Sequence, residues 1–510
     1  MTLNARQIAF RERDNRNTTG SIQFLSAPVG SGKTEAIIWD IRAGIHNNSY
    51  IFISPTVRLA QEIKNRLDIA LVNQGQGQNA HLIVTDETEP QSVQQRVLNR
   101  IISRLPNEQH ILIITTETFR NVLPNIPQER KAHYHVFMDE GIEPVDFVEF
   151  RTQNQALFLE PIEIGDDHSF SIAEDGHELL EAVARSPARL AAMERQELSV
   201  PQYQQIAKFL TANIYDVYGD VSARTIRVVA FLRPDYFLSF RSVTIIMAIF
   251  EQSLLALFWQ EKYGIEFSAY QTDHELFDTH GIKGPLISIH HALHPDDTAS
   301  ALNLKRNAET GAHGGDPENQ ERVIDRIAEA VEQRFGDRPY CWAANSFFAN
   351  APRILANPRM PTQCAGMDVF KQHDIVVSLT CINPPPWVKD IITRHVAITD
   401  GELYELWKLS HTYQTIGRCS LRDRRANRPI DVVVISRDCA ERIQGLFEGS
   451  NIVGQITTLP SYEGMRHRRG AAIGRRTYTR ADNTAWSRYR SSHPDTRLTK
   501  EEWYVTVRTN

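Results

Sequence analysis

The sequence predicts an α/β protein whose parallel sheets are covered by helices on both faces. Within the first 140 residues, short apolar runs typical of strands alternate with amphipathic stretches typical of helices. A second stretch with the same alternation begins at about residue 266. Because buried strands separated by helices form parallel sheets, we expect two α/β units, one after the other. Glycine-rich and acidic turns follow strands of the first unit, and ligands of such sheets bind at the carboxyl ends of the strands.

Length and composition set the outer limits. A chain of 510 residues is too long for one core, so about three domain-sized units are expected. Its 41% hydrophobic and 23% charged residues are those of an ordinary soluble globular protein. The longest apolar candidate, residues 242–250, is far shorter than the roughly 18 residues that span a bilayer. The five cysteines form no CxxC pair, which argues against a zinc site or a disulfide framework and favours a reducing, cytoplasmic setting.

The elements of the first unit follow from apolar periodicity. Strands are expected where apolar and β-branched residues run together, at 21–25, 50–54, 82–85, 111–115 and 135–138. One helix is expected from Thr34 to about Ile45. The next helix shows four-residue spacing of its apolar face, made by Leu59, Ile63, Leu67 and Leu71. The sheet therefore alternates with helices from its first strand.

The later elements suggest where the domains divide. The alternation loosens at about 146–235, where two helical stretches (roughly 176–195 and 202–217) indicate an insertion of unknown role. The run at 244–250 returns to the first sheet. The second unit has a helix at 320–335, a helix that carries Gln414, and strands at 339–344, 375–379 and 430–435. The predicted domains are 1–265 with the insertion, 266–460, and a small C-terminal extension, 461–510.

A glycine-rich turn, APVGSGKT at residues 27–34, follows the first strand. Gly30 and Gly32 allow a tight turn whose amide groups converge on phosphate oxygens. Lys33 supplies a charge for the β- and γ-phosphates, and Thr34 offers a hydroxyl to magnesium at the start of a helix. The strict pattern begins with glycine, and Ala27 stands in that place. The predicted nucleotide-binding set is Ala27, Pro28, Gly30, Ser31, Gly32, Lys33 and Thr34.

Two carboxylates end the strand at 135–138. Asp139 is expected to bind magnesium through water, and Glu140 to orient or deprotonate an attacking water. Acid pairs are common on surfaces, so this pair gains its meaning from the phosphate loop in the same unit. ATP and Mg²⁺ are the expected ligands.

A third segment, QTIGRCSLR at residues 414–422, carries an amide and two guanidinium groups. If it is helical, Gln414, Arg418 and Arg422 recur every four residues and share one face. Guanidinium groups match phosphate oxygens, and an arginine supplied from another domain can accelerate phosphoryl transfer by about 10³–10⁵. Leu409, Tyr413 and Ile416 indicate that this helix is partly buried. Arg424 and Arg425 are spare candidates for a contact with phosphate, although they are more typical of a basic surface cluster.

These segments together resemble the superfamily 2 helicases of the DExx-box (DEAD/DEAH-like) type, which have two tandem RecA-like domains. The resemblance covers roughly residues 20–440, without the insertion. Residues 27–34, 139–142 and 414–422 resemble motifs I, II and VI of that superfamily. Residues 55–61 resemble motif Ia, and residues 115–119 resemble the segment that follows it along a bound strand. The resemblance implies ATP hydrolysis, with Glu140, Gln414, Arg418 and Arg422 in catalytic roles and Thr34 and Asp139 at the magnesium.

The same resemblance implies contacts with a nucleic-acid strand, at Pro55, Thr56, Arg58, Thr116 and Thr380. In the motif III position, Met247, Ala248 and Ile249 replace the hydroxyl residues that help couple hydrolysis to domain motion in family members. The gap from Arg418 to Arg422 is one residue longer than the commonest motif VI spacing.

The C-terminal segment 461–510 is basic and aromatic. Its eleven Lys/Arg and five acids give a charge of +6, against −12 for the rest of the chain. Its aromatic residues could stack on bases while its arginines contact phosphates, or could pack on the core. The stacking candidates are Tyr462, Tyr478, Trp486, Tyr489, Trp503 and Tyr504.

The sequence therefore favours an ATP-dependent helicase or translocase on nucleic acid, working in the cytoplasm without a membrane. The tail, and a general similarity to helicases of phages and mobile elements, favour DNA over RNA. One alternative is a viral-type P-loop motor that packages DNA. Another is an ATP-gated binding switch without unwinding. A protein partner in replication or another nucleic-acid process is expected only in general terms.

Overall fold

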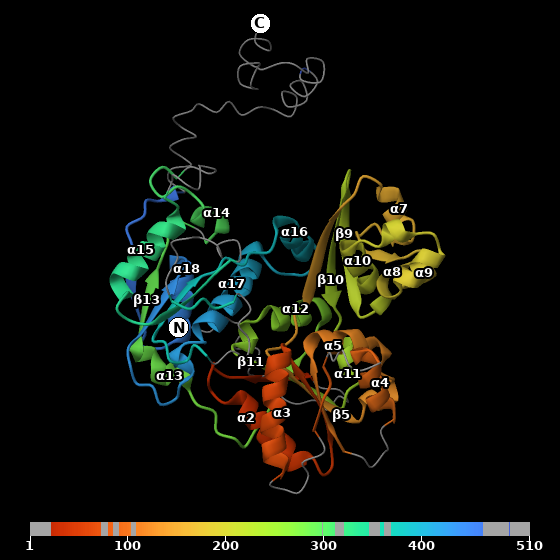
Figure 1. Cartoon of the computed structure of the whole chain (residues 1–510), viewed down its shortest axis with the longest axis horizontal. Helices are drawn as coiled ribbons and strands as arrows, with labels where there is room; N and C mark the ends of the chain where they lie inside the picture. Colours follow the sequence, from red (N-terminus) through yellow and green to blue (C-terminus); the bar gives the residue numbers. More distant parts are fainter. Residues whose placement is uncertain are drawn as a thin grey trace.

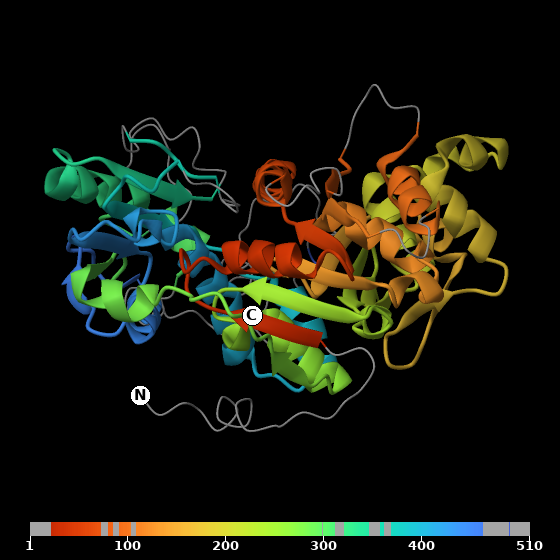
Figure 2. The same ribbon diagram turned by 90° about the horizontal axis from the view of Figure 1, so that it is seen from below.

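The computed structural model describes residues 22–72, 80–84, 91–103, 109–297, 299–311, 321–345, 357–361, 369–462 and 489. Two parallel sheets form two α/β domains, and a third, smaller sheet belongs to the insertion (Figure 1). In Figure 2 the first domain lies between the second domain and the insertion. The two parallel sheets confirm the predicted fold of two tandem RecA-like units. Among the described residues, no helix has the length and apolar character needed to cross a membrane.

The first domain is built on a seven-stranded parallel sheet, in the order β12-β1-β11-β5-β2-β4-β3. Its strands are β1 (Ile22–Ser26), β2 (Ser49–Ser54), β3 (Ala80–Leu82), β4 (Ile111–Thr115), β5 (Tyr134–Asp139), β11 (Ser242–Met247) and β12 (Phe267–Ala269). Its helices include α2 (Lys33–Gly44), α3 (Val57–Val72), α4 (Val93–Ser103), α5 (Thr116–Val122) and α12 (Leu254–Tyr263). Separate apolar clusters cover the two faces, with Ile37, Ile63 and Leu67 in one and Val97, Phe119 and Trp259 in the other.

The expected strands of this sheet all form, and β11 returns between β1 and β5 as the apolar run at 244–250 predicts. Two details differ. Strand β3 ends at Leu82 rather than at 85, and β12 pairs with β1 although it lies beyond the expected boundary at residue 265. The first sheet therefore extends into the segment that the sequence assigned to the second domain, because β12 finds its partner at the open edge of β1.

The insertion packs helices on one face of an antiparallel sheet, β6 (Val145–Arg151), β10 (Thr225–Leu232) and β9 (Tyr215–Ser222). Its helices are α7 (Gln155–Leu159), α8 (His177–Arg185), α9 (Pro187–Ala192) and α10 (Pro201–Ala212), and a small hairpin joins β7 (Ile162–Ile164) to β8 (Phe170–Ile172).

Both expected helices of the insertion are shorter than the sequence indicated. The stretch at 176–195 divides at Ser186, because proline is favoured at the first position of a new helix. The stretch at 202–217 ends at Ala212, where Asn213 takes a left-handed conformation with φ of 55°, and the chain then enters β9. Asparagine tolerates this conformation and commonly ends helices.

The second domain has a five-stranded parallel sheet, in the order β14-β15-β16-β13-β17. Its strands are β13 (Ile287–His291), β14 (Tyr340–Ala344), β15 (Ile375–Leu379), β16 (Ile430–Val434) and β17 (Asn451–Gln455). Its helices are α13 (Thr279–Lys283), α14 (Ala301–Leu304), α15 (Val323–Phe335), α16 (Pro386–His395), α17 (Asp400–Ile416) and α18 (Arg437–Leu446). The strands and helices expected from 320 to 435 are confirmed.

Helix α16 joins the two domains. It belongs to the second domain by sequence, yet Val388, Ile391 and Ile392 are fully buried in the apolar cluster of the first domain. Its other end reaches the insertion, where His395 stacks on Tyr218 with ring centroids 3.8 Å apart. Figure 1 shows α16 beside β10, between the two lobes. Apolar burial of this extent ties the second domain to the first away from the cleft between them.

Candidate active site

The phosphate loop is formed by the turn between β1 and α2. Gly30 and Gly32 have φ of 73° and 93°, which lies in the left-handed region. Glycine adopts this region without the steric cost of a Cβ atom. Helix α2 begins directly after Gly32, so its amino-terminal end faces the turn. The local sequence therefore builds the anion-binding geometry that APVGSGKT predicts.

Lys33 lies within this loop. Its Nζ donates to the carbonyl oxygens of Ala27 and Pro28, at 2.6 and 2.8 Å. Burial lowers the pKa of Lys33 to about 8, partly opposed by the nearby Glu140 and Asp139 carboxylates. A desolvated ammonium group gains more from an anionic ligand than an exposed one does. Lys33 is therefore placed to bind a phosphate group.

The acid pair ends strand β5, beside the loop. Asp139 is buried, and its Oδ2 lies 3.5 Å from the hydroxyl of Thr34 on α2. Burial, reinforced by the neighbouring Glu140, raises the pKa of Asp139. Glu140 has a positive φ of 64°, held by a 2.9 Å bond from its N–H to the carbonyl of Ile246. Backbone strain of this kind in a non-glycine residue is common at functional sites.

The second domain reaches Glu140 through two side chains. Gln414 Nε2 lies 3.1 Å from Glu140 Oε2, and Arg418 Nη2 lies 3.2 Å from Glu140 Oε1. The Arg418 side chain is only 4% exposed, so this ion pair is weakly screened by water. The structure thus brings Glu140 together with two residues that lie 274 and 278 positions further along the sequence.

The expectation that Gln414, Arg418 and Arg422 share one helix is wrong. Helix α17 ends at Ile416, Gly417 caps it, and Arg422 lies in a separate 3₁₀ turn, Ser420–Arg422. Residues 420–422 leave the helix because the N–H of Ser420 bonds to the carbonyl of His373, in the segment before β15. Arg422 still lines the cleft, but from a different element.

A cleft of about 610 Å³ lies between the domains and contains all of these groups. Both domains line it, the first with its phosphate loop, α2, α3 and acid pair. The lining from the second domain is mostly basic and consists of Lys371, Gln414, Arg418, Arg422, Asp423, Arg424 and Arg425. The first domain's wall combines carboxylates with Lys33, and the second domain's wall is mostly basic, which suits a ligand that carries both phosphates and a metal ion.

The glycines of the loop also allow the two domains to approach closely. A Cβ atom on Gly30 would stand 2.8 Å from Cα of Arg422, and one on Gly32 would collide with the Arg424 guanidinium group. Real side chains do not tolerate such contacts with backbone atoms. Glycine is therefore needed at position 30 for two reasons, the turn and the contact with the second domain.

Four contacts with the phosphate loop escaped the sequence analysis. The hydroxyl of Tyr413 accepts from Val29 N–H at 3.0 Å, and Thr279 Oγ1 donates to Val29 O at 2.8 Å. Phe277 N–H and Arg424 Nη2 both donate to Ser31 O, at 2.9 and 2.7 Å. Tyr413 carried a weak signal, since it directly precedes Gln414. Arg424 was a spare candidate for a contact with phosphate, whereas Phe277 and Thr279, just before and at the start of α13, have no pattern of their own.

The candidate nucleic-acid contacts divide between the domains. Pro55 and Thr56 follow β2, and Thr116 follows the adjacent strand β4. Ser54 links them, because its hydroxyl bonds to Thr56 O at 3.3 Å and its carbonyl accepts from Thr116 Oγ1 at 3.3 Å. Arg58 is exposed on the first turn of α3.

Thr380 lies apart from these residues, directly after β15 in the second domain. Its hydroxyl is buried and has no hydrogen-bond partner among the described residues. At the motif III position, Met247 ends β11, while Ala248 and Ile249 pack against the apolar core of the second domain. At the motif III position, the two domains are therefore in contact through apolar side chains, in place of the hydroxyl residues that family members carry there.

Most of the C-terminal extension lies outside the described residues, including Tyr478, Trp486, Trp503 and Tyr504. Tyr462 is described, and it is not available for base stacking. Its ring is fully buried in the second domain, its hydroxyl bonds to Ala308 O at 3.0 Å, and its N–H bonds to Asp297. Tyr462 belongs to the core because it closes the end of the second sheet's apolar cluster.

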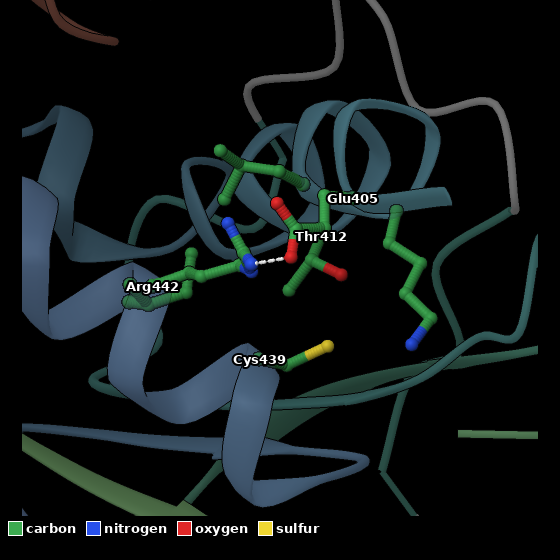
Figure 3. A pocket seen from close by; sticks show the side chains of 7 residues that line it. Glu405, Thr412, Cys439 and Arg442 are labelled. Carbon is green, nitrogen blue, oxygen red and sulfur yellow. Dashed lines mark ion pairs between the residues drawn. The ribbon is translucent and has the colours of Figure 1, made fainter. Parts of the chain in front are cut away.

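A small cavity of about 10 Å³ lies between α17 and α18 in the second domain (Figure 3). Glu405 and Arg442 form an ion pair across it, and Cys439 and Thr412 line it. Burial raises the pKa of the Cys439 thiol, which favours the unreactive form. A space of this size holds about one water molecule, so it is a packing feature.

The residues present fit ATP and a divalent cation. Gly30 and Gly32 have the positive φ values that the phosphate-binding turn needs, and the enclosed ammonium group of Lys33 lies within that turn. The hydroxyl of Ser31 is buried and has no hydrogen-bond partner among the described residues. Thr34 and Asp139 offer a hydroxyl and a carboxylate, which are oxygen ligands of the kind that Mg²⁺ prefers.

Comparisons with known proteins agree with this geometry. Residues 13–141 match the family model of the DEAD/DEAH box helicases. No curated protein matches the sequence of the chain.

Solved structures show a distant likeness. The DEAD-box helicase Mss116, bound to ssRNA and UDP-BeF, is 11% identical with a TM-score of 0.35, over 95% of this chain and 80% of that one. Dbp5 of S. cerevisiae, bound to RNA and ADP BeF3, is 9% identical with a TM-score of 0.37, over 89% of both chains. The helicase MrfA is 12% identical with a TM-score of 0.31, over 86% of this chain and 52% of that one. These values are too low to assign a substrate.

Proposed function

We propose that this chain, an ATP-hydrolysing helicase of superfamily 2 with a DEAD/DEAH box domain in residues 13–141, moves along or unwinds nucleic acid. One observation carries the proposal. Gln414 and Arg418 of the second domain reach Glu140, which lies beside the phosphate loop of the first domain. A ligand between these groups would contact both domains, so its binding and hydrolysis would change how they sit together.

In the proposed reaction, Lys33 and the loop amides bind the β- and γ-phosphates of ATP. Thr34 and Asp139 would hold Mg²⁺, which supplies charge neutralisation at the phosphate oxygens when bound. Glu140 orients the attacking water and accepts its proton. Arg418 and Arg422 stabilise the charge that develops on the transferred phosphoryl group.

The contact between Arg418 and Glu140 suggests how ATP binding is sensed. A γ-phosphate would compete with Glu140 for the Arg418 guanidinium group, because both are anions. When the arginine turns to the phosphate, Glu140 is released to act on water. Gln414 remains beside Glu140 and holds its orientation.

The nucleic-acid strand is proposed to cross the carboxyl ends of β2 and β4, at Pro55, Thr56, Arg58 and Thr116, and to reach Thr380 in the second domain. The link through Ser54 supports a shared surface for the first group. We propose DNA as the polymer, on the basic, aromatic composition of residues 461–510, and the cytoplasm as the location. A nucleic-acid-processing protein is the proposed partner.

A first experiment measures ATP hydrolysis alone and with single-stranded DNA, single-stranded RNA or duplex, using Lys33→Ala as the control. Stimulation by DNA that is lost in the variant supports the proposal. Stimulation by RNA alone overturns the choice of polymer.

A strand-displacement assay with the same protein separates a motor from a switch. The switch has a structural argument, since Ala248 and Ile249 lack the hydroxyl groups of motif III. Displacement that depends on ATP supports the helicase. Hydrolysis that changes affinity for the strand, without displacement or movement, favours the switch.

A further inference from the structure

A side chain of the second domain donates hydrogen bonds to backbone carbonyl groups of the phosphate loop. Arg424 Nη2 donates to Ser31 O at 2.7 Å, and Arg424 Nε donates to Gly30 O at 3.3 Å. The guanidinium carbon lies 5.6 Å from the centre of the Phe277 ring. Phe277 N–H also donates to Ser31 O, at 2.9 Å, so both lone pairs of that carbonyl are occupied.

This contact acts on the amide groups that face a phosphate. Ser31 C=O and Gly32 N–H belong to the same peptide unit. A cation bound to the carbonyl draws electron density from the unit and makes its N–H a stronger donor, as in cooperative hydrogen-bond chains. The amides of such a turn are the groups that bind phosphate oxygens. The Ser31 N–H is already directed to Pro28 O, at 3.2 Å, so the effect falls mainly on Gly32.

Arg424 differs in this from the two arginines of the proposed mechanism. Arg418 pairs with the catalytic acid Glu140. Both Arg422 and Arg424 line the cleft, and Arg424 also donates hydrogen bonds to the backbone of the phosphate loop. Arg424 instead holds the backbone of the loop that would carry the β-phosphate. Its effect should extend to a diphosphate, whereas an arginine that contacts the γ-phosphate acts only on the triphosphate and its transition state.

We infer that Arg424 is a positioning residue, by which the second domain strengthens the hold of the phosphate loop on a nucleoside diphosphate or triphosphate. The inference rests on the proposed function, since it requires that the loop binds a nucleotide. It makes nucleotide affinity depend on where the second domain sits. A movement of the second domain that withdraws Arg424 would weaken the loop and favour release of ADP.

The test uses the full chain with Arg424→Ala, Arg424→Lys and the matched control Arg428→Ala. Arg428 lies four residues away and pairs with Asp374, so its loss removes the same charge from the same segment. Binding of fluorescent ADP and ATP analogues and steady-state ATP hydrolysis are measured for each. Arg424→Ala should weaken the binding of both nucleotides by about three- to tenfold, the net value of one ordinary hydrogen bond. It should raise KM for ATP by the same factor and leave kcat within about twofold. Arg424→Lys should recover part of the loss, and Arg428→Ala should match the wild type.

Two outcomes overturn the inference. A fall in kcat with unchanged ADP affinity would make Arg424 another γ-phosphate contact. ADP and ATP affinities equal to those of the wild type in both Arg424 variants would make the contact irrelevant to binding. Failure of the wild-type protein to bind ADP would instead contradict the proposed function. If Arg424→Ala does not fold, Arg424→Lys alone decides, because it keeps the charge but loses the two-donor geometry.

Discussion

The two halves of the cleft come from domains of the same fold, yet they contribute opposite chemistry in different ways. The first domain places its phosphate loop and its acids at the ends of strands β1 and β5. The second domain places Arg418 and Arg422 in a turn that follows helix α17. The wall from the first domain thus combines carboxylates with Lys33 and Arg66, whereas the wall from the second domain is mostly basic.

The difference shows that the parallel sheets fix where the functional groups lie, whereas the turns after strands and helices carry most of those groups. After β13 of the second sheet, the N–H groups of Ala292 and Leu293 bond to Val434 O and Ile435 O, both at 2.9 Å. These N–H groups extend the sheet, so they are not available to bind a phosphate group. After β1 of the first sheet, glycines turn the chain away and leave the phosphate loop. In the proposed function, the first α/β domain is therefore the half that binds the phosphates, and the second is the half that responds to them.

The largest expected effect concerns the arginine from the second half. Arg418→Ala should lower kcat for ATP hydrolysis by about 10³–10⁵, because the developing phosphoryl charge loses its cation. The control is Arg442→Ala, which also removes an arginine paired with a glutamate, but that pair joins α18 to Glu405 of α17 within the second domain. Steady-state hydrolysis at saturating ATP is the measurement. A fall of less than about tenfold would limit Arg418 to holding Glu140.

The next effect tests whether α16 belongs structurally to the first domain. Ile391 is completely buried in the first domain's core, so Ile391→Ala should lower the free energy of unfolding by about 2–5 kcal/mol. Ile282 is 56% exposed, and Ile282→Ala should change it by less than about 0.5 kcal/mol. Urea denaturation, followed by fluorescence and circular dichroism, gives both values. Equal free energies of unfolding in the two variants would mean that α16 does not contribute to the core of the first domain.

A smaller effect tests the close approach at Gly30. Gly30→Ala adds a Cβ atom that must displace Arg422, and ATP turnover should fall by about ten- to a hundredfold because the halves of the site move apart. Gly264 has a similar φ of 66° with nothing within 4 Å of its Cβ position, so Gly264→Ala carries the backbone strain alone. Turnover should stay at the wild-type value in that control. Equal losses in both variants would assign the effect to strain.

The smallest effect lies at His280 of α13, which forms a 2.7 Å hydrogen bond with Tyr413, the residue whose hydroxyl contacts Val29 of the first domain. Burial, with help from the nearby Lys33, lowers the pKa of His280 to about 4 from an ordinary 6.5. Between these pH values His280 is protonated in the unfolded chain and neutral in the folded chain. The free energy of unfolding therefore falls as the pH drops from 6.5 to 4. Unfolding measured across this range should show a shallower slope in His280→Asn. An unchanged slope would mean that His280 does not supply this dependence.

The sequence by itself determined the local elements of the site. Four-residue spacing in α3 and the β-branched runs of β2 and β4 encode helix and strand through side-chain periodicity. Gly30, Gly32 and Lys33 encode the loop because backbone conformation and charge are local properties. Asp139 and Glu140 could be predicted as site residues from their position at the end of an apolar strand.

Only the tertiary structure decided how distant segments meet. It divided Gln414 from Arg422, because residue 420 bonds to His373 in the segment before β15. It brought Tyr413, Phe277 and Arg424 to the phosphate loop, and it buried Tyr462, which the sequence offered to nucleic acid. It also placed α16 in the core of the other domain. These outcomes depend on packing and hydrogen bonds between residues far apart in the chain, and such contacts leave no periodic trace in the sequence.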